Sequence, residues 1–215
     1  GETWFRVPET VRVEVEGTPS PWVGGKDLIL SLIGMIGVEG ARYAALEFGG
    51  EGIAALPMDD RFTVANMAVE AGAKTGLFVP DDRTLDYAAA RAARPFEAVF
   101  PDPGASYART VRIDAGHLEP VVALPHLPSN VKPAAGSGSL ELDQVFIGSC
   151  TNGRLRDLEL AAAVLKNRTV HERVRLVVIP ATAEVFAEAL KRGYIETFLE
   201  AGASVSTATC GPCLG

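Results

Sequence analysis

The spacing of apolar and polar residues changes period along the first half of the chain. Residues 10–16 alternate between polar side chains and valine, which predicts a half-buried strand. Residues 27–36 carry apolar side chains at helical spacing, which predicts an amphipathic helix that Gly37 closes. The same reasoning predicts four more strands, at residues 43–48, 75–79, 107–114 and 120–124. It also predicts an alanine-rich helix at residues 82–93.

A second helix is predicted near residues 63–72, with Thr63 as its N-cap and Gly72 as its stop. Asn66 and Glu70 stand four positions apart in this helix, so they share one of its faces. A polar pair of this kind can serve a binding site, but it more often forms a solvated face. The pattern alone therefore leaves the role of Asn66 and Glu70 open.

A stretch rich in Pro, Ala, Gly and Ser at residues 133–140 predicts a linker between two domains, residues 1–132 and 141–215. Beyond the linker, predicted strands alternate with predicted helices. The strands lie at residues 144–148, 174–179 and 204–208, and the helices at residues 154–166 and 183–191. Such alternation is typical of parallel strands with crossover helices. The predicted fold class is α/β, with two three-layer units built on mainly parallel sheets.

Three cysteines carry the candidate chemistry of the second half. Cys150 follows the predicted strand 144–148, while Cys210 and Cys213 follow the predicted strand 204–208. Open α/β sheets place their ligand sites beyond the carboxyl ends of strands, which is where these residues fall. Three thiolates suit an iron–sulfur cluster or a zinc ion, and a four-iron cluster with three cysteines keeps one iron open. A dithiol redox pair, half of a zinc site and a buried structural Cys150 remain alternatives.

The residues just after Cys150 are candidate partners of a bound group. Thr151 or Asn152 is expected to cap the helix that follows, whose first amides favour an anionic cluster or carboxylate. Arg154 can neutralise the charge of a cluster or substrate. A solvated surface cation is an equal alternative for Arg154.

Composition and charge exclude several functions. The 215 residues are 47% hydrophobic and carry a formal net charge of −7. Non-specific nucleic-acid binding needs concentrated Lys and Arg, so we expect no nucleic-acid partner. The sequence lacks an apolar run of about 20 residues and a signal-peptide pattern, so we expect a cytoplasmic protein with reduced thiols and no membrane partner. Because the sequence opens at Gly1 and stops two residues after Cys213, we also expect a fragment.

Two motifs resemble a known family. Gly148-Ser149-Cys150-Thr151-Asn152-Gly153-Arg154 and Cys210-Gly211-Pro212-Cys213 are similar to motifs of the aconitase superfamily, and within it to large subunits of 3-isopropylmalate dehydratase and homoaconitase. The resemblance covers essentially the whole chain and corresponds to the middle of such a subunit. It implies an aconitase-like second domain at residues 1–132 and a truncated cluster-binding domain at residues 141–215. It also implies that Cys150, Cys210 and Cys213 hold a [4Fe-4S] cluster.

The resemblance further implies roles for other residues. Residues 60–76 look like the family's second-domain motif, which makes Asn66 and Glu70 the expected catalytic residues that reach the cluster-bound substrate and water. Arg154 and Asn152 are the expected substrate-binding residues. The implied partners are a hydroxy polycarboxylate substrate and a small subunit that completes the active site in a heterodimer.

The implied reaction is a dehydration followed by rehydration that moves a hydroxyl group. The expected substrate pair is 3-isopropylmalate and 2-isopropylmalate in leucine biosynthesis, with homoaconitate in lysine biosynthesis as the alternative. The family's N-terminal domain and the arginine-bearing segment after its second cysteine motif have no counterpart in these 215 residues. The isolated chain is therefore expected to be inactive. A non-catalytic iron–sulfur module and a zinc-stabilised fragment are the alternatives from other functional classes.

Overall fold

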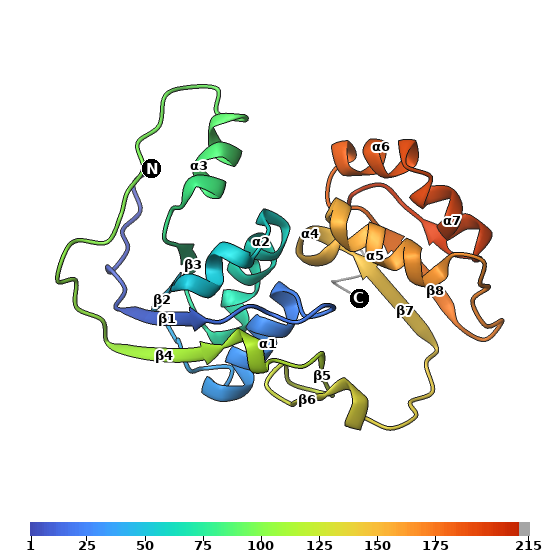
Figure 1. The fold of residues 1–215 in the computed structure, drawn as a ribbon, viewed down its shortest axis with the longest axis horizontal. Helices are drawn as coiled ribbons and strands as arrows, with labels where there is room; N and C mark the ends of the chain where they lie inside the picture. Colours follow the sequence, from blue (N-terminus) through green and yellow to red (C-terminus); the bar gives the residue numbers. More distant parts are fainter. Residues whose placement is uncertain (211–215) are drawn as a thin grey trace. The chain divides into compact units, whose positions relative to one another are not determined.

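The computed structural model describes residues 1–210 and divides the chain into two compact units. Unit 1 is Gly1–Ser137, and unit 2 begins at Gly138 (Figure 1). The division falls within the stretch that was expected to be a linker. Its first residues are nevertheless structured, because Pro133 belongs to a strand and Ala134–Gly136 form a short 3₁₀ turn.

Unit 1 is built on a four-stranded parallel sheet. Its strands are β1 (Thr10–Glu16), β2 (Ala45–Gly49), β3 (Thr75–Phe78) and β4 (Arg109–Asp114), in the order β3-β2-β1-β4. Val13 of β1 lies beside Phe48 of β2 on one side and beside Val111 of β4 on the other. Because all of these strand pairs are parallel, the predicted α/β class with mainly parallel sheets is confirmed.

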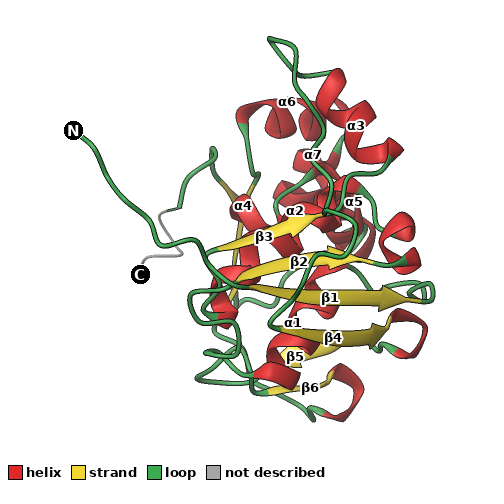
Figure 2. Cartoon of the chain, turned by 90° about the vertical axis from the view of Figure 1, so that its left-hand side faces the viewer, coloured by secondary structure: helices red, strands yellow, loops and turns green. Residues whose placement is uncertain are grey.

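Two helices, α1 (Gly25–Ile36) and α2 (Met58–Met67), cover one face of this sheet (Figure 2). The valines of β1 are buried against them, together with the apolar stripe of α1, which comprises Leu28, Ile29, Leu32 and Ile33. Gly37 ends α1 with a φ of 79°, as predicted, because glycine adopts positive φ without a steric penalty. The predicted helix is confirmed, and it begins two residues earlier than expected.

On the other face of the unit 1 sheet, the central strand β1 presents polar side chains. Arg12 of β1 donates to Glu14 and to Glu47 of β2, at 2.8 and 2.7 Å. The Tyr107 hydroxyl, from the segment that leads into β4, donates to Glu47 at 2.7 Å. Strict alternation along β1 therefore separates an apolar face from a face held by hydrogen bonds.

The remaining elements of unit 1 are short. They are the 3₁₀ helices η1 (Glu51–Ala55), η2 (Ala68–Ala71), η3 (Ala115–His117) and η4 (Ala134–Gly136), helix α3 (Asp82–Ala89), and strands β5 (Val121–Ala123) and β6 (Val131–Pro133). β5 and β6 pair antiparallel, and β6 was not predicted. α3 ends before the predicted residue 93, because it buries no residue fully and gains little packing from a longer course.

A buried arginine ties α2 to the start of α3. The Arg61 side chain is 2% exposed and donates to both carboxylate oxygens of Asp81, at 2.6 and 2.7 Å. It also donates to the carbonyl oxygens of Leu56 and Ile53. Asp81 caps α3 by accepting from the Thr84 amide. The Arg61 hydrogen bonds lower the pKa of Asp81 well below its usual value.

Unit 2 has a parallel sheet in the order β7-β8-β9, formed by β7 (Gln144–Gly148), β8 (Arg175–Ile179) and β9 (Ser204–Val205). Its helices are α4 (Ser149–Asn152), α5 (Leu155–Leu165), α6 (Ala183–Lys191) and α7 (Tyr194–Glu200). The core is apolar and includes Leu158, Leu176, Val178 and Phe198. α7 was not predicted, since Gly193, at φ 78°, separates it from α6 and resembles a helix stop.

The helices of residues 1–210 are short. The longest, α1, has 12 residues, whereas a helix that crosses a bilayer needs about 20 apolar residues. Within these residues, no helix has the length and apolar character that a membrane span requires.

Candidate functional site

The Cys150 loop, residues 148–154, begins with a sharp turn at the carboxyl end of β7. Gly148 has a φ of 124°, and a Cβ atom there would lie 2.0 Å from the carbonyl oxygen of Ile179 on β8. Only glycine fits at this close approach. Ser149 follows in a left-handed conformation, with a φ of 60°, and its side chain is buried. The turn then places Cys150 on the single-turn helix α4 with its side chain exposed.

Asp157 holds the other end of the Cys150 loop. Its carboxylate accepts from the Asn152 side-chain amide at 3.0 Å and from the Arg154 backbone amide at 2.9 Å. Arg154, rather than Thr151 or Asn152, is the N-cap of α5, so the expected capping roles are wrong. The reason is that residues 149–152 already form α4, and Gly153 ends that turn before α5 begins.

The structure brings three of the predicted site residues into one loop, namely Cys150, Asn152 and Arg154. Cys210 lies beyond the end of β9 with an exposed side chain, and Cys213 is outside the described residues. Residues 1–210 contain no group of three His, Cys, Asp or Glu side chains arranged to hold a metal ion. Exposed thiols at the carboxyl end of a parallel sheet nevertheless fit a cluster, because iron–sulfur clusters take thiolate ligands.

Asn66 and Glu70 lie on one continuous helical stretch in unit 1. Asn66 is on α2, Glu70 is on η2, and both side chains are exposed. Gly72 ends this stretch with a φ of 82°, as predicted. Thr63 is not the N-cap, because α2 already begins at Met58 after Pro57, and the Thr63 hydroxyl donates to the Asp59 carbonyl oxygen instead. Asp59 and Asp60 in the first turn favour this earlier start, because negative charge stabilises a helix N-terminus.

Glu70 lines a pocket of about 470 Å³ in unit 1. The pocket walls are mostly apolar and come from α1, α2, η2, β5 and the turn before β6. The lining residues are Lys26, Leu30, Met67, Glu70, Val121, Val122, Ala123 and Pro128. Lys26 therefore shares a pocket with Glu70, which sequence reasoning missed. The available signal was Lys26 itself, the single cation of a mostly apolar helix.

Asp27 fixes one wall of this pocket. One of its carboxylate oxygens accepts from the Gly24 amide at 2.9 Å, and the other accepts from the Val121 amide at 2.8 Å. The first bond caps α1, and the second attaches β5 to the start of that helix. Asp27 thereby sets the position of the β5 wall relative to Lys26, its neighbour in sequence.

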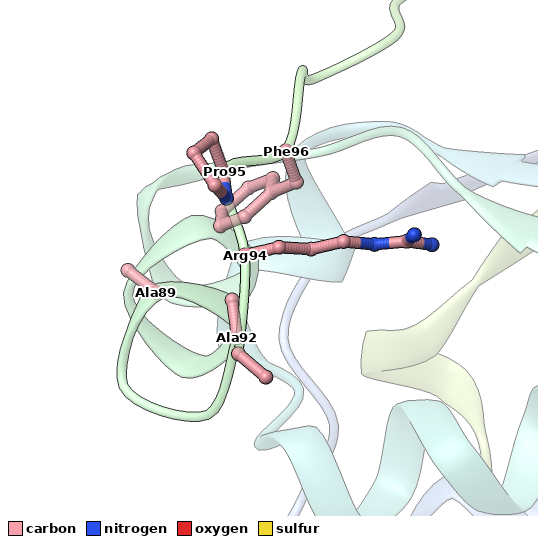
Figure 3. A pocket seen from close by; sticks show the side chains of 6 residues that line it. Ala89, Ala92, Arg94, Pro95 and Phe96 are labelled. Carbon is pink, nitrogen blue, oxygen red and sulfur yellow. The ribbon is translucent and has the colours of Figure 1, made fainter.

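A second hollow, of about 500 Å³, lies at the end of α3 and in the segment that follows it (Figure 3). Its lining residues are Ala89, Ala92, Ala93, Arg94, Pro95 and Phe96. All of these residues are exposed, and the Arg94 side chain extends away from Ala89 and Pro95. A hollow with this lining offers little catalytic chemistry, so the Glu70 pocket is the better candidate in unit 1.

A protein-family model described as the aconitase family (aconitate hydratase) matches residues 1–139 and 131–215. Over all 215 residues the chain is 57% identical to the 3-isopropylmalate dehydratase large subunit of Syntrophus aciditrophicus, and 56% identical to that of Moorella thermoacetica. It covers 51% of each relative, so the chain spans about half the length of these curated relatives.

A solved structure supports the fold. The holo-form of aconitase X from Thermococcus kodakaraensis aligns with 94% of this chain and 44% of its own, at a TM-score of 0.50 and 16% sequence identity. At this level of identity the likeness concerns the fold alone. It agrees with the predicted aconitase-like arrangement of parallel sheets and helices.

Proposed function

Because the chain belongs to the aconitase family, we propose that it is part of an iron–sulfur hydro-lyase, the large subunit of 3-isopropylmalate dehydratase of leucine biosynthesis. One observation carries this proposal. The strand-to-helix turn at Gly148 presents an exposed Cys150 in the same loop as Asn152 and Arg154. The names of the curated relatives support the choice of this substrate over homoaconitate.

The proposed cofactor is a [4Fe-4S] cluster with Cys150, Cys210 and Cys213 as its ligands. The exposed thiols of Cys150 and Cys210 fit this role, because soft thiolates are the preferred ligands of iron–sulfur clusters. Such a cluster, when bound through three cysteines, supplies a Lewis acid that makes hydroxide a better leaving group.

The residues of the chain would bind and orient the substrate. Arg154 supplies a cation for a substrate carboxylate, and Asn152 supplies an amide for hydrogen bonding. Asn66 would orient water through hydrogen bonds, and Glu70 would exchange a proton with that water. Lys26 lines the Glu70 pocket, so its charge would offset that of Glu70 or of an incoming carboxylate.

The proposed partners follow from the proposed reaction. A small subunit would complete the active site as the second chain of a heterodimer, and the substrate would be a hydroxy polycarboxylate. The second-domain role of residues 1–132 and the cluster-binding role of residues 141–215 are part of the same proposal, as is a cytoplasmic location. On this proposal the 215 residues are inactive by themselves.

The first experiment tests the cluster. The chain is reconstituted anaerobically with iron and sulfide, and the wild type is compared with Cys150→Ser. We expect absorption near about 400 nm from sulfur-to-iron charge transfer in the wild type, and its loss in the variant. Ser139→Ala, a change of one exposed residue without a thiol, is the control and should keep the absorption. Bound zinc without this absorption would refute the cluster.

The second experiment tests the reaction. A full-length large subunit that contains these residues is combined with its small subunit and supplied with 3-isopropylmalate or homoaconitate. We expect faster conversion of 3-isopropylmalate, and Glu70→Gln should lower kcat by about 100-fold, because general acid–base groups contribute on this scale. Preference for homoaconitate would refute the proposed substrate.

A further inference from the structure

Asp157 joins α4, the helical turn inside the Cys150 loop, to α5, the helix that follows the loop. One carboxylate oxygen accepts from the side-chain amide of Asn152 in α4, and the other accepts from the backbone amide of Arg154 at the start of α5. Asp157 itself is the third residue of α5. A single carboxylate therefore connects the one-turn helix that bears Cys150 to a helix of 11 residues.

The loop needs such a connection, because its only regular secondary structure between β7 and α5 is the short helix α4. α4 has only four residues, and an isolated helical turn is unstable since few hydrogen bonds offset the ordering of its backbone. The loop also begins with two positive φ angles in succession, at Gly148 and Ser149. Left-handed backbone at a residue other than glycine is unfavourable and persists only when surrounding contacts hold it.

The chemistry of the two bonds requires a carboxylate. Both partners of Asp157 in this loop are N–H donors, and an ionised carboxylate offers an acceptor oxygen to each. An asparagine would keep one acceptor and present a donor in place of the other, and an alanine would lose both. Bonds to a charged acceptor are also stronger than those between neutral groups.

We propose that Asp157 is a positioning residue, which holds the Cys150 loop in the shape required for ligation. This inference rests on the proposed cluster function for its consequence, but its structural part concerns Asp157, Asn152 and Arg154 alone. Asp157 acts through the loop and has no assigned contact with substrate or cluster.

The first test needs no metal. Backbone hydrogen exchange is measured on the metal-free chain for residues 150–154 in the wild type, Asp157→Ala and Asp157→Asn. We expect exchange about 30-fold faster in Asp157→Ala, on the scale of two lost hydrogen bonds, and an intermediate rate in Asp157→Asn. Thr197→Val is the control: it removes one side-chain hydrogen bond from α7, to the Gly193 carbonyl, and should leave these amides unchanged.

The set of amides that exchange faster in Asp157→Ala decides whether Asp157 positions the loop or only caps α5. If faster exchange in Asp157→Ala extends to the amides of residues 150–152, the carboxylate positions the loop. If it stops at Arg154, or if Thr197→Val produces the same change, Asp157 is a helix cap only and the proposal is wrong.

The second test uses the cluster. The reconstituted chains are compared by electron paramagnetic resonance and by the half-life of their visible absorption in air. We expect a severalfold shorter half-life in Asp157→Ala than in Thr197→Val, with partial rescue in Asp157→Asn, and equal half-lives would overturn the proposal. If the wild type acquires no cluster, the proposed function fails, and the exchange experiment still decides the role of Asp157.

Discussion

The two units hold their candidate functional groups in different ways. In unit 1, Glu70 follows a helix that packs on a large apolar core and is tied down by the buried Arg61. In unit 2, Cys150 lies on a single helical turn whose course is set by the backbone at Gly148 and Ser149. Side-chain burial therefore supports the first group, whereas backbone geometry and local hydrogen bonds support the second.

Both units nevertheless use one common device. Asp27 in α1 and Asp157 in α5 each stand third in their helix, and each accepts the backbone amide of the N-cap residue with one oxygen. The other oxygen is then available for a different segment, which is β5 in unit 1 and the Asn152 side chain in unit 2. One aspartate can thus hold a segment of a candidate site in position and still accept the hydrogen bond from the N-cap amide of its own helix.

The largest expected effect tests the dependence of unit 2 on its backbone. Gly148→Ala should destabilise unit 2 by about 3 kcal/mol more than Gly202→Ala, on the scale of overpacking in a tight site. Both glycines have positive φ, but a Cβ atom at Gly148 meets the Ile179 carbonyl oxygen, whereas one at Gly202 has no neighbour within 4 Å. Chemical unfolding followed by circular dichroism measures the difference. Equal losses would mean that the close approach at Ile179 matters little.

The next effect tests the dependence of unit 1 on its buried charge. Asp81→Asn should destabilise unit 1 by about 2 kcal/mol, since it leaves the buried Arg61 guanidinium without an anion, and the partial exposure of Asp81 moderates the loss. Asp82→Asn, on the neighbouring exposed residue, is the matched control and should have a small effect. Hydrogen exchange of β3 amides reports on unit 1 separately from unit 2.

The Arg61–Asp81 ion pair should also make the stability of unit 1 fall at low pH. The folded state lowers the pKa of Asp81 from its usual 3.8, chiefly through the Arg61 hydrogen bonds. The stabilisation is therefore fully present above the unfolded pKa and is lost as pH falls through the folded pKa. Unit 1 of the wild type should lose more stability between pH 5 and pH 2 than unit 1 of Asp81→Asn, about the range over which such a carboxylate titrates. Parallel curves would contradict the role of the pair.

The parts of the fold and site that the sequence predicts are those determined by local patterns. The alternation of residues 10–16 and the strand at residues 144–148 are both borne out as β1 and β7, because side-chain spacing alone defines them. The place of Cys150 directly after a strand was also predicted, whereas the helical turn α4 that bears it was not.

The parts that the sequence does not predict depend on contacts between distant segments. Lys26 meets the Glu70 pocket only because α1 packs beside η2, and β6 forms only because β5 offers it a partner. α7 is stable because Ile195 and Phe198 enter the core of unit 2, although Gly193 reads as the end of the helical segment. Local propensity carries no information about such partners.

The smallest of these effects tests whether the two aspartates are equivalent. Asp27→Ala should destabilise unit 1 by about 1.5 kcal/mol, which is the scale of a lost helix cap and one further hydrogen bond. The amide of Val121 should exchange faster, since it donates to Asp27 across a separation of 94 residues. Asp82→Ala, in the first turn of α3, is the control and should leave Val121 protected. If Val121 stays protected in Asp27→Ala as well, packing rather than the carboxylate holds β5, and only unit 2 relies on a third-position aspartate to shape its site.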